Sequence, residues 1–600
     1  MKIFGIYGGY LNHDPGVCLI EDGKIVFSWN EERPRRIKPS KIDDLQKMKS
    51  VVEGIWPNDG GYGDGESYDE LSEMADWGFP YRSIEIIKQR YKLDFNEVDY
   101  FAITSPVPIE MKDFFSEYNI PLSKLIINNH HVSHCAGAYY TSGFKEDTFV
   151  FSYDAGGLTD DLGIEATYGK TFIGSKNKMK EINRFPMGQT NTIPCGYGYI
   201  TAWLGWTPNK DEGKVTGLAG HGEYDEVLYN AFTKLSSYDR QLMRFTNKYG
   251  FNGATTSGEG IRMLMTELHN NGHNLSHWFE TQKQNRPDIS DEVLTKHKND
   301  LAYNYQLYME DQIIEYLNHL HELYPEIRKM CVAGGLFGNV KLNQRINELD
   351  WLDEMYVYPA MNDAGLGLGS ALKVAADKGV WKTKKFKNLF LGYEYTKKET
   401  DDFFFKSPSN DFSNMIRFDL DNDYVAQKLH DGKIVGYFKG RFEFGPRALG
   451  ARSILVRPTD AETHATLNRR LGRTEIMPFA PIVIDTEANK VFHTNNKSHY
   501  TAEFMTICYN TRKEWIPRIP AVVHEVDSTA RPQIVKKDNP FYPVITRYHK
   551  LSDIPVLLNT SFNIHGEPII ESPEQALVHL KNGVVDLLVI DDYMYEVGNE

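Results

Sequence analysis

The 600-residue sequence has few cysteines and no long apolar run. No CxxC pair occurs among its five cysteines, which are Cys18, Cys135, Cys195, Cys331 and Cys508. This scatter argues against a disulfide framework and fits a reducing compartment. No stretch of about eighteen apolar residues is present, and the opening MKIFGIYGGY has no signal-peptide core. We therefore expect a soluble cytoplasmic protein without a membrane partner.

The sequence also lacks the positive charge of a general nucleic-acid binder. Its formal net charge is -15 and its pI is about 5.7, which disfavours non-specific binding of nucleic acid. A local basic groove stays open, and its candidates are Arg33, Arg35, Arg36, Lys38 and Lys41. The length predicts at least two domains.

A short arginine turn is the most informative feature that is present. The run GRFEFGPRALGARS at residues 440–453 combines glycines, a proline and three arginines. Arginine forks bind phosphate or carboxylate, and glycines let backbone amides approach an anion. Other donor-rich loops follow, with candidate anion ligands at Arg447, Arg473, Ser528, Arg531, Asn559 and Ser561. These loops predict a site for a small polyanionic substrate.

Glycine turns after apolar strands indicate a second, nucleotide-binding cleft. A strand over residues 147–153 leads to Asp154 and a small-residue turn, and a strand over 330–333 leads to a glycine turn and a helix from residue 344. A further glycine turn at 362–369 also precedes a helix. Strand, turn and helix together hold phosphates. The candidate nucleotide ligands are Gly156, Gly157, Gly334, Gly335 and Asn339.

Two histidines with helical spacing suggest a metal site. If a helix begins in NHHVSH, His130 and His134 share one face and His131 points elsewhere. Asp154 and Asp363 in glycine turns would complete a His, His, Asp, Asp set. Such a set suits iron(II), manganese or zinc better than calcium.

Collinear blocks along the chain resemble the NodU/CmcH family of O-carbamoyltransferases, which includes the tobramycin and cephamycin enzymes. The blocks are NHDPGVCLIEDGKIVFSWNEER, NHHVSHCAGAYY, DEGKVTGLAGHG, CVAGGLFGNVKLN, NDAGLGLGSA, GRFEFGPRALGARS, STARPQ and LLNTSFNIHGEP. They span nearly the whole chain. One departure is Asn12-His13-Asp14-Pro15-Gly16, where many family members read Gly-His-Asp-Ala-Ser.

The resemblance implies an α/β protein of two parts. Residues 1–385 would form an actin- and sugar-kinase-like (ASKHA) carbamoyl-transfer domain that holds the metal. Residues 386–600 would form a YrdC-like domain that makes carbamoyl adenylate. The basic stretch 378–398 follows the last glycine-rich helix and fits a linker.

The implied reaction consumes ATP and carbamoyl phosphate, with Mg²⁺ assisting. Carbamoyl adenylate made in the second domain would pass to the first, where an acceptor hydroxyl attacks it. His13 is the candidate general base, beside Asp14, and Lys214 would contact nucleotide or acceptor. A metal held by the His and Asp set, with Fe²⁺ the leading candidate and Zn²⁺ or Mn²⁺ as alternatives, would assist there.

The acceptor remains open at this stage. It is a hydroxyl of a small natural product, sugar or nucleoside, or, as the alternative, a hydroxymethylated base such as 5-hydroxymethylcytosine in DNA. Two alternatives belong to other functional classes: a non-catalytic nucleotide-dependent sensor and a sugar kinase. A sugar kinase would leave the last two hundred or so residues unexplained. The oligomeric state is also open, with a homodimer as one candidate.

Overall fold

The computed structural model describes residues 1–8, 14–36, 79–105, 107, 110–157, 166–186, 193–208, 211–246, 290–407, 411–473 and 477–598. His13 therefore lies outside the described residues. Among the described helices, none is long and apolar enough to cross a membrane.

The chain opens as a five-stranded sheet of strand order β3-β2-β1-β4-β5. Its strands are β1 (Lys2–Tyr7), β2 (Gly16–Glu21), β3 (Lys24–Asn30), β4 (Tyr100–Thr104) and β5 (Leu125–Asn128). β1 pairs antiparallel with β2 and parallel with β4, so the carboxyl ends of β1, β4 and β5 meet at one edge. Apolar residues on alternate positions bury the sheet on both faces.

A second five-stranded sheet repeats this topology in the order β12-β11-β6-β7-β8. Its strands are β6 (Thr148–Gly157), β7 (Thr167–Ser175), β8 (Lys178–Pro186), β11 (Lys329–Ala333) and β12 (Glu354–Val357). Here too an antiparallel hairpin flanks a parallel core, because β6 pairs antiparallel with β7 and parallel with β11. The repeat agrees with the actin-like first part that was predicted.

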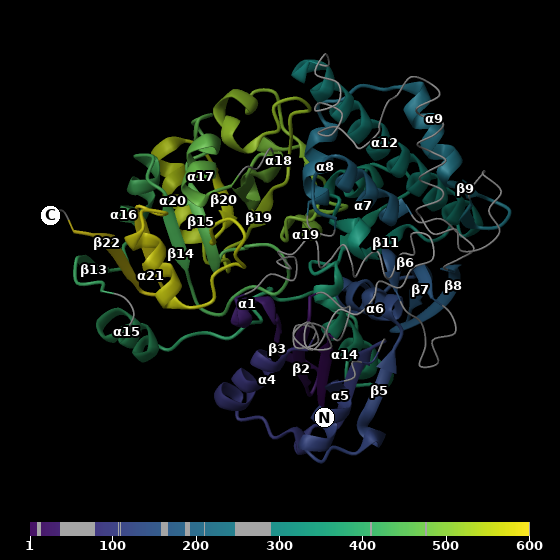
Figure 1. Cartoon of the computed structure of the whole chain (residues 1–600), viewed down its shortest axis with the longest axis horizontal. Helices are drawn as coiled ribbons and strands as arrows, with labels where there is room; N and C mark the ends of the chain where they lie inside the picture. Colours follow the sequence, from purple (N-terminus) through teal and green to yellow (C-terminus); the bar gives the residue numbers. More distant parts are fainter. Residues whose placement is uncertain are drawn as a thin grey trace, which may run out of the picture.

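Helices cover both sheets and join them. They are α1 (Glu32–Arg35), α4 (Tyr81–Ile86), α5 (Glu110–Glu117), α6 (His130–Ser142), α7 (Ile193–Trp203), α8 (Glu212–Ala219), α9 (Glu226–Leu235), α12 (Asp291–Leu323), α13 (Val340–Asn347) and α14 (Leu366–Asp377). Helices α6 and α14 lie between the two sheets (Figure 1). Gly369 makes their close contact, since a Cβ there would meet Ser133 O at 2.0 Å.

The C-terminal half is built on an eight-stranded mixed sheet of order β13-β22-β21-β14-β15-β20-β16-β19. Its strands are β13 (Met415–Asp419), β14 (Val435–Phe438), β15 (Arg452–Val456), β16 (Ala480–Ile484), β19 (Gln533–Val535), β20 (Val556–Ser561), β21 (Leu587–Ile590) and β22 (Tyr593–Val597). This half stands on the left of Figure 1. The α/β class predicted for both parts is thus confirmed.

Shorter elements complete the described chain. The C-terminal half has α15 (Lys397–Lys406), α16 (Asn422–His430), α17 (Thr463–Leu471), α18 (Ala488–Val491), α19 (His499–Ala502), α20 (Tyr542–Ser552), α21 (Pro573–Lys581) and the strand pair β17 (Tyr509–Asn510) and β18 (Thr529–Ala530). The first half also contains the strand pair β9 (Ser237–Asp239) and β10 (Arg244–Thr246). Short helical turns are η1 (Ile87–Tyr91), η2 (Phe95–Glu97), η3 (Leu122–Lys124), η4 (Gly335–Gly338), η5 (Asp363–Gly365), η6 (Asp485–Glu487), η7 (Ile516–Arg518) and η8 (Pro520–Val522).

Three element boundaries differ from the sequence expectations. β6 continues through Gly157 with an irregular register after Tyr153, so the expected small-residue turn is extended strand. Helix α13 begins at residue 340 instead of 344, because Asn339 caps it. Helix α14 begins at residue 366, inside the expected glycine turn, because the glycines there pack against neighbouring backbone.

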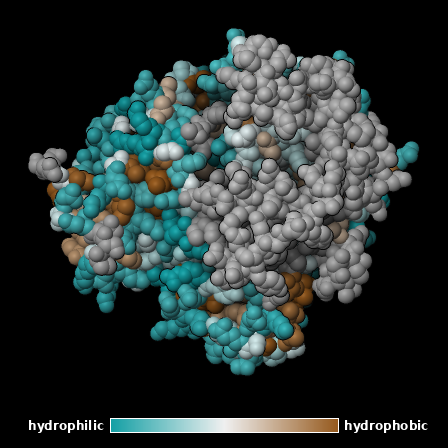
Figure 2. Space-filling model, in the orientation of Figure 1, coloured by the Kyte–Doolittle hydropathy of each residue, from teal (hydrophilic) through white to brown (hydrophobic). Residues whose placement is uncertain are grey.

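Residues 378–396 connect the two halves without helix or strand, and the division after residue 385 stays a prediction. Hydrogen bonds tie this connection to both sides, from Ser28 N to Leu391 O and from Gly392 N to Phe442 O. Hydrophilic side chains dominate the described surface of the C-terminal half in the face shown in Figure 2. The apolar cores therefore lie inside, where a contiguous cluster includes residues of both halves.

Candidate active site

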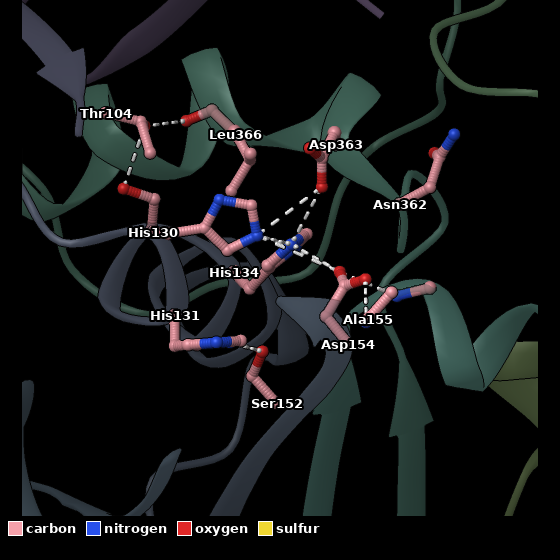
Figure 3. Close-up of polar contacts among 12 residues, drawn as sticks. Thr104, His130, His131, His134, Ser152, Asp154, Ala155, Asn362, Asp363 and Leu366 are labelled. Carbon is pink, nitrogen blue, oxygen red and sulfur yellow. Dashed lines mark hydrogen bonds and ion pairs between the residues drawn. The ribbon is translucent and has the colours of Figure 1, made fainter. Parts of the chain in front are cut away.

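The two histidines of helix α6 face two aspartates that come from distant strands. Asn129 caps the helix through its side chain, which accepts hydrogen bonds from His131 N and Val132 N. His130 and His134 then project from one face, and their Nε2 atoms lie 3.2 Å apart. His131 points away to Ser152 (Figure 3), as predicted from the spacing.

Asp154 on β6 and Asp363 in η5 complete the cluster. His134 Nε2 lies 3.3 Å from Asp154 Oδ2 and 3.3 Å from Asp363 Oδ1. His130 Nε2 lies 3.8 Å and 3.5 Å from the same two atoms. One ligand atom from each residue falls within 4.8 Å of the others. The sequence thus identified four side chains that the fold brings together (Figure 3).

These spacings fit a bound transition metal. A tetrahedron with bonds of about 2.1 Å has ligand-to-ligand edges of about 3.4 Å, close to the distances observed. Two neutral imidazoles and two carboxylates suit Fe²⁺, Mn²⁺ or Zn²⁺. Three of the four side chains are buried and Asp154 is nearly so, hence a cation would compensate charge that is otherwise costly.

The charges in the cluster reinforce one another. Burial alone would lower the pKa of His134, but hydrogen bonds and attraction from Asp154 and Asp363 outweigh it and raise the pKa to about 9. Burial opposes ionisation of Asp154, yet the two histidines hold its pKa well below the usual range. Asp154 therefore stays ionised, and a metal bound here would displace the proton of His134. Burial keeps His131 neutral by lowering its pKa well below normal.

Outer hydrogen bonds orient both carboxylates. Tyr7 Oη donates to Asp363 Oδ2 across 2.6 Å, while Ala155 N and Gly335 N donate to Asp154 across 2.7 Å and 3.0 Å. Such partners fix the direction of metal ligands. Sequence reasoning missed Tyr7, and its position at the carboxyl end of the first strand was the available signal.

Two of the glycines predicted to bind nucleotide pack against the His and Asp cluster or the strand that carries it. A Cβ on Gly157 would meet the His130 ring at 2.7 Å, and one on Gly334 would meet Tyr153 O at 2.4 Å. Gly334 also has a φ of 98°, which glycine adopts without strain. Gly156, next along β6, is half-buried. A nucleotide contact at these positions stays a prediction.

Asn339 is fully engaged inside the protein. Its Oδ1 accepts hydrogen bonds from Lys341 N and Leu342 N, and its Nδ2 donates to Gln306 Oε1 across 2.8 Å. Thr216 of α8 lies within hydrogen-bond distance as well. Asn339 therefore shapes the start of α13.

Asp14 lies beside the metal cluster and Lys214 does not touch it. Asn362, the neighbour of Asp363, donates from Nδ2 to Asp14 Oδ2 across 3.0 Å. Lys214 pairs with Asp211 at 3.0 Å on α8. Among the described contacts, none joins Lys214 to the cluster.

The arginine turn is anchored by a buried carboxylate. Glu443 is 1% exposed, and its Oε1 accepts hydrogen bonds from Leu449 N, Ala451 N and Arg452 N at 2.8–3.0 Å. Arg33 from the first half lies 3.6 Å from the other oxygen. The sequence did not single out Glu443, although an acid inside an arginine-rich turn was its signal.

Arg447 and Arg531 have no acidic partner among the described residues. Neither guanidinium makes a hydrogen bond or ion pair with the residues that the structure describes, and Arg447 Nε is buried without a partner. Burial and repulsion from Arg531 lower the pKa of Arg447 to about 9, which still leaves it charged at neutral pH. Burial lowers the pKa of Arg531 as well. Two such cations in one place call for a polyanion.

The other predicted anion ligands differ from this pair. Arg473 is bound to protein: it donates to Thr560 Oγ1, Ser561 Oγ and Asn563 Oδ1 at 2.9–3.1 Å. Its hydrogen bonds therefore hold the loop after β20. Ser528 has a φ of 57° and uses its backbone to meet Thr511 and His524.

Lys341 of the first half pairs with Asp527 of the C-terminal half. Its Nζ lies 2.9 Å from Asp527 Oδ2, and Val340 O accepts a hydrogen bond from Cys508 N. Lys341, Arg447 and Arg531 all act on the pKa of the buried Cys508 thiol, which burial raises to about 11. All three cations therefore lie near Cys508.

The basic groove expected near Arg33 is wrong for two of its members. Arg33 is 3% exposed and pairs with Glu443. Arg36 donates to Ile569 O and Pro568 O of the C-terminal half. Both arginines hold the halves together instead of facing solvent. Lys38 and Lys41 lie outside the described residues.

The fold and the site thus define a two-part α/β protein with a His and Asp cluster in its first half and two charged arginines in its second. Family models match both parts, a carbamoyltransferase N-terminus over residues 75–372 and a carbamoyltransferase C-terminus over residues 426–597. The chain belongs to this carbamoyltransferase family, whose relatives include NodU-type nodulation proteins.

Individual relatives cover most of the chain. Uncharacterized protein MJ1058 of Methanocaldococcus jannaschii is 28% identical over 99% of this chain and 99% of its own length. Nodulation protein NolNO of Sinorhizobium fredii is 26% identical over 97% of this chain and 78% of its own. A solved structure of full-length HypF, in a phosphate- and nucleotide-bound form, is 13% identical with a TM-score of 0.31 and covers 64% of this chain and 47% of that one.

Proposed function

We propose that this carbamoyltransferase is an ATP-dependent O-carbamoyltransferase that uses carbamoyl phosphate. The observation that carries the proposal is the Arg447 and Arg531 pair, which has charge but no anion among the described residues. Phosphate groups of carbamoyl phosphate and ATP match such donors.

The first step would take place at the arginine turn. Water cleaves carbamoyl phosphate to carbamate and phosphate. A carbamate oxygen then attacks the α-phosphorus of ATP, a bond to pyrophosphate breaks, and carbamoyl adenylate forms. Arg447 and Arg531 stabilise the negative charge that spreads over the phosphate oxygens, and Mg²⁺ assists. Arg473, which donates to Ser561, is proposed to bind phosphate together with it.

The second step would use the metal cluster. An acceptor hydroxyl attacks the carbamoyl carbon, the bond to AMP breaks, and a base takes the hydroxyl proton. His13 is the proposed base, and Asp14, which accepts a hydrogen bond from Asn362, is proposed to act beside it. A divalent metal on His130, His134, Asp154 and Asp363, with Fe²⁺ favoured, would neutralise adenylate phosphate oxygens.

A screen of hydroxyl compounds is needed to identify the acceptor. Small natural products, sugars and nucleosides are the first class to test, and hydroxymethylated DNA is the second. Because Arg33 and Arg36 are engaged between the halves, they offer no basic face for DNA. A small hydroxyl compound is therefore the favoured acceptor.

The deciding experiment measures pyrophosphate release from ATP, with and without carbamoyl phosphate and with no acceptor. Carbamoyl-phosphate-dependent release is expected, and Arg531→Ala should reduce it by at least about 100-fold, as loss of a charge-stabilising donor does. Arg518→Ala is the matched control, because Arg518 is exposed and pairs with Asp553.

Two results would contradict the proposal. No carbamoyl-phosphate-dependent release from folded, metal-loaded protein would favour the sensor reading. Equal release by Arg531→Ala and Arg518→Ala would remove the arginine pair from the donor site. Circular dichroism of each variant shows whether the fold is kept.

A further inference from the structure

Asn559 lies next to the arginine turn and is almost completely buried. It is 2% exposed on strand β20, where it pairs with Leu455 of β15 and Ala480 of β16. Its Nδ2 donates to Ala448 O, the residue after Arg447, across 2.9 Å. Asn559 is thus fixed to the segment that carries the unpaired guanidinium.

Neighbouring carbonyl groups determine which way the Asn559 amide points. Ala448 O can only accept, so the Asn559 atom that faces it must be the NH₂ nitrogen. The second NH₂ hydrogen is directed to Gln533 Oε1 at 3.5 Å. Gln533 is oriented in turn, because its Nε2 donates to Leu449 O across 2.9 Å. The carbonyl groups of Ala448 and Leu449 therefore fix the orientation of the Asn559 and Gln533 side-chain amides.

This orientation leaves Asn559 Oδ1 as a buried acceptor without a donor among the described residues. A buried polar atom of this kind costs free energy unless a partner meets it. Phosphate oxygens are mostly ionised hydrogen-bond acceptors at neutral pH, so Oδ1 is a poor partner for them. The geometry of this side chain thus offers no free donor to a phosphate, and the predicted phosphate contact of Asn559 stays untested.

Ser453 supplies a second unpartnered group on the same face. It pairs with Ser561 in the β15 and β20 register, two residues before Leu455, so its side chain lies on the face of Asn559. Ser453 is 0% exposed and its Oγ has no partner in the described structure. Asn559 Oδ1 and Ser453 Oγ thus belong to neighbouring residue pairs on one face of the sheet, beside the arginine turn.

We propose that Asn559 Oδ1 accepts a hydrogen bond from the carbamoyl NH₂ group and so makes this site specific for carbamoyl over other acyl phosphates. The inference rests on the proposed function. Carbamoyl phosphate, carbamate and carbamoyl adenylate all keep the NH₂ group, so one contact serves every stage. Acetyl phosphate has a methyl group there, which would leave Oδ1 unpaired.

The test compares two stable phosphonates of similar size in the full chain. Phosphonoacetamide carries NH₂ where acetonylphosphonate carries methyl. The wild-type protein should bind the amide about 10- to 100-fold more tightly, as expected for one buried hydrogen bond and its penalty when unmet. In Asn559→Leu the ratio should fall close to one, while binding of inorganic phosphate at the arginines should persist.

Asn539→Leu is the matched control. Asn539 also donates to Leu449 O, but its Oδ1 already accepts from Phe541 N. Its substitution disturbs the same turn without removing an open acceptor, so the ratio should stay at the wild-type value. An equal loss in Asn539→Leu would overturn the proposal.

The affinity ratio of the wild-type protein for the two phosphonates tests the proposal even when Asn559→Leu does not fold. A wild-type ratio near one overturns the proposal, as does an unchanged ratio in folded Asn559→Leu. The proposed function fails separately, through absence of carbamoyl-phosphate-dependent pyrophosphate release from wild-type protein.

Discussion

Tyr7 acts on the metal cluster through one hydrogen bond. Its hydroxyl donates to Asp363 Oδ2 across 2.6 Å, and burial first, then the neighbouring carboxylates, raise the pKa of Tyr7 well above its normal value. The hydroxyl therefore stays protonated and remains a donor. It turns the other carboxylate oxygen towards the histidines.

Tyr7→Phe removes that donor and keeps the ring. Metal affinity should fall by about 10- to 100-fold, the usual cost of losing an outer partner of a metal ligand. Isothermal titration with Zn²⁺ or Mn²⁺ measures it, with Asp154→Asn as the stronger variant and Asp147→Asn, at an exposed position just before β6, as the control. Unchanged metal affinity in Tyr7→Phe would show that the Tyr7 hydrogen bond does not orient Asp363.

Asn559, Arg473 and Arg447 show the limit of prediction for single residues. All three were predicted to hold phosphate because each lies in a donor-rich loop. Only the hydrogen-bond partners distinguish them: Arg473 donates to Asn563, whereas Arg447 Nε has no partner among the described residues. Partners of this kind come from segments far apart in the chain.

Among the larger elements, the arginine turn depends on a carboxylate that binds its backbone. Glu443 accepts three amide hydrogens, and attraction from Arg33 and Arg452 overcomes burial to keep its pKa below the usual value. The turn is thus a rigid support for Arg447.

Glu443→Gln should loosen that support. A displacement of about 1 Å in a positioned group costs up to about 100-fold in rate, so we expect kcat/KM for carbamoyl phosphate to fall about 10- to 100-fold, with KM raised. Steady-state pyrophosphate release measures it. The exposed Glu462→Gln serves as control, and a loss in kcat alone with unchanged KM would contradict a role in holding the donor site.

The corner between β3 and α4 contains a carboxyl group with an unusual titration. Glu31 accepts hydrogen bonds from Arg82 N and Ser83 N, yet burial raises its pKa from 4.5 to about 7. The folded state therefore favours the protonated form. Its stabilising contribution is complete below pH 4.5 and is lost as the pH rises through about 7.

This shift predicts a pH-dependent stability. Between pH 4.5 and 8, the unfolding free energy should lose about 3 kcal/mol through Glu31, from 1.36 kcal/mol per pKa unit. Urea denaturation of the wild type and Glu31→Gln at several pH values measures it, and the variant should show the flatter dependence. Parallel curves would assign the slope to other groups.

For the whole molecule, the two halves are joined by hydrogen bonds to buried backbone. Asn343 of α13 is 0% exposed and donates to Phe337 O in its own half and Thr506 O in the other. Thr501 Oγ1 similarly donates to Met355 O. The arginine turn and the His and Asp cluster therefore belong to two halves that pack against each other.

Asn343→Leu leaves both carbonyl groups without a donor. Each unmet buried group costs about 1–3 kcal/mol, so the variant should lose about 2–6 kcal/mol and melt at a lower temperature in calorimetry. Because the bond crosses the halves, the unfolding of both should shift. A shift confined to the first half would mean that the interface does not couple them.

The sequence by itself determined the α/β class, the family and the helix face that carries His130 and His134. These depend on local periodicity and on collinear blocks, which a linear chain displays directly. Only the tertiary structure decided that Tyr7 donates to Asp363, that Arg473 is hydrogen-bonded to the loop at Asn563, and that Asn559 Oδ1 has no donor among the described residues. The physical reason is that hydrogen bonds and burial are set by residues hundreds of positions apart, which meet only when the sheets pack.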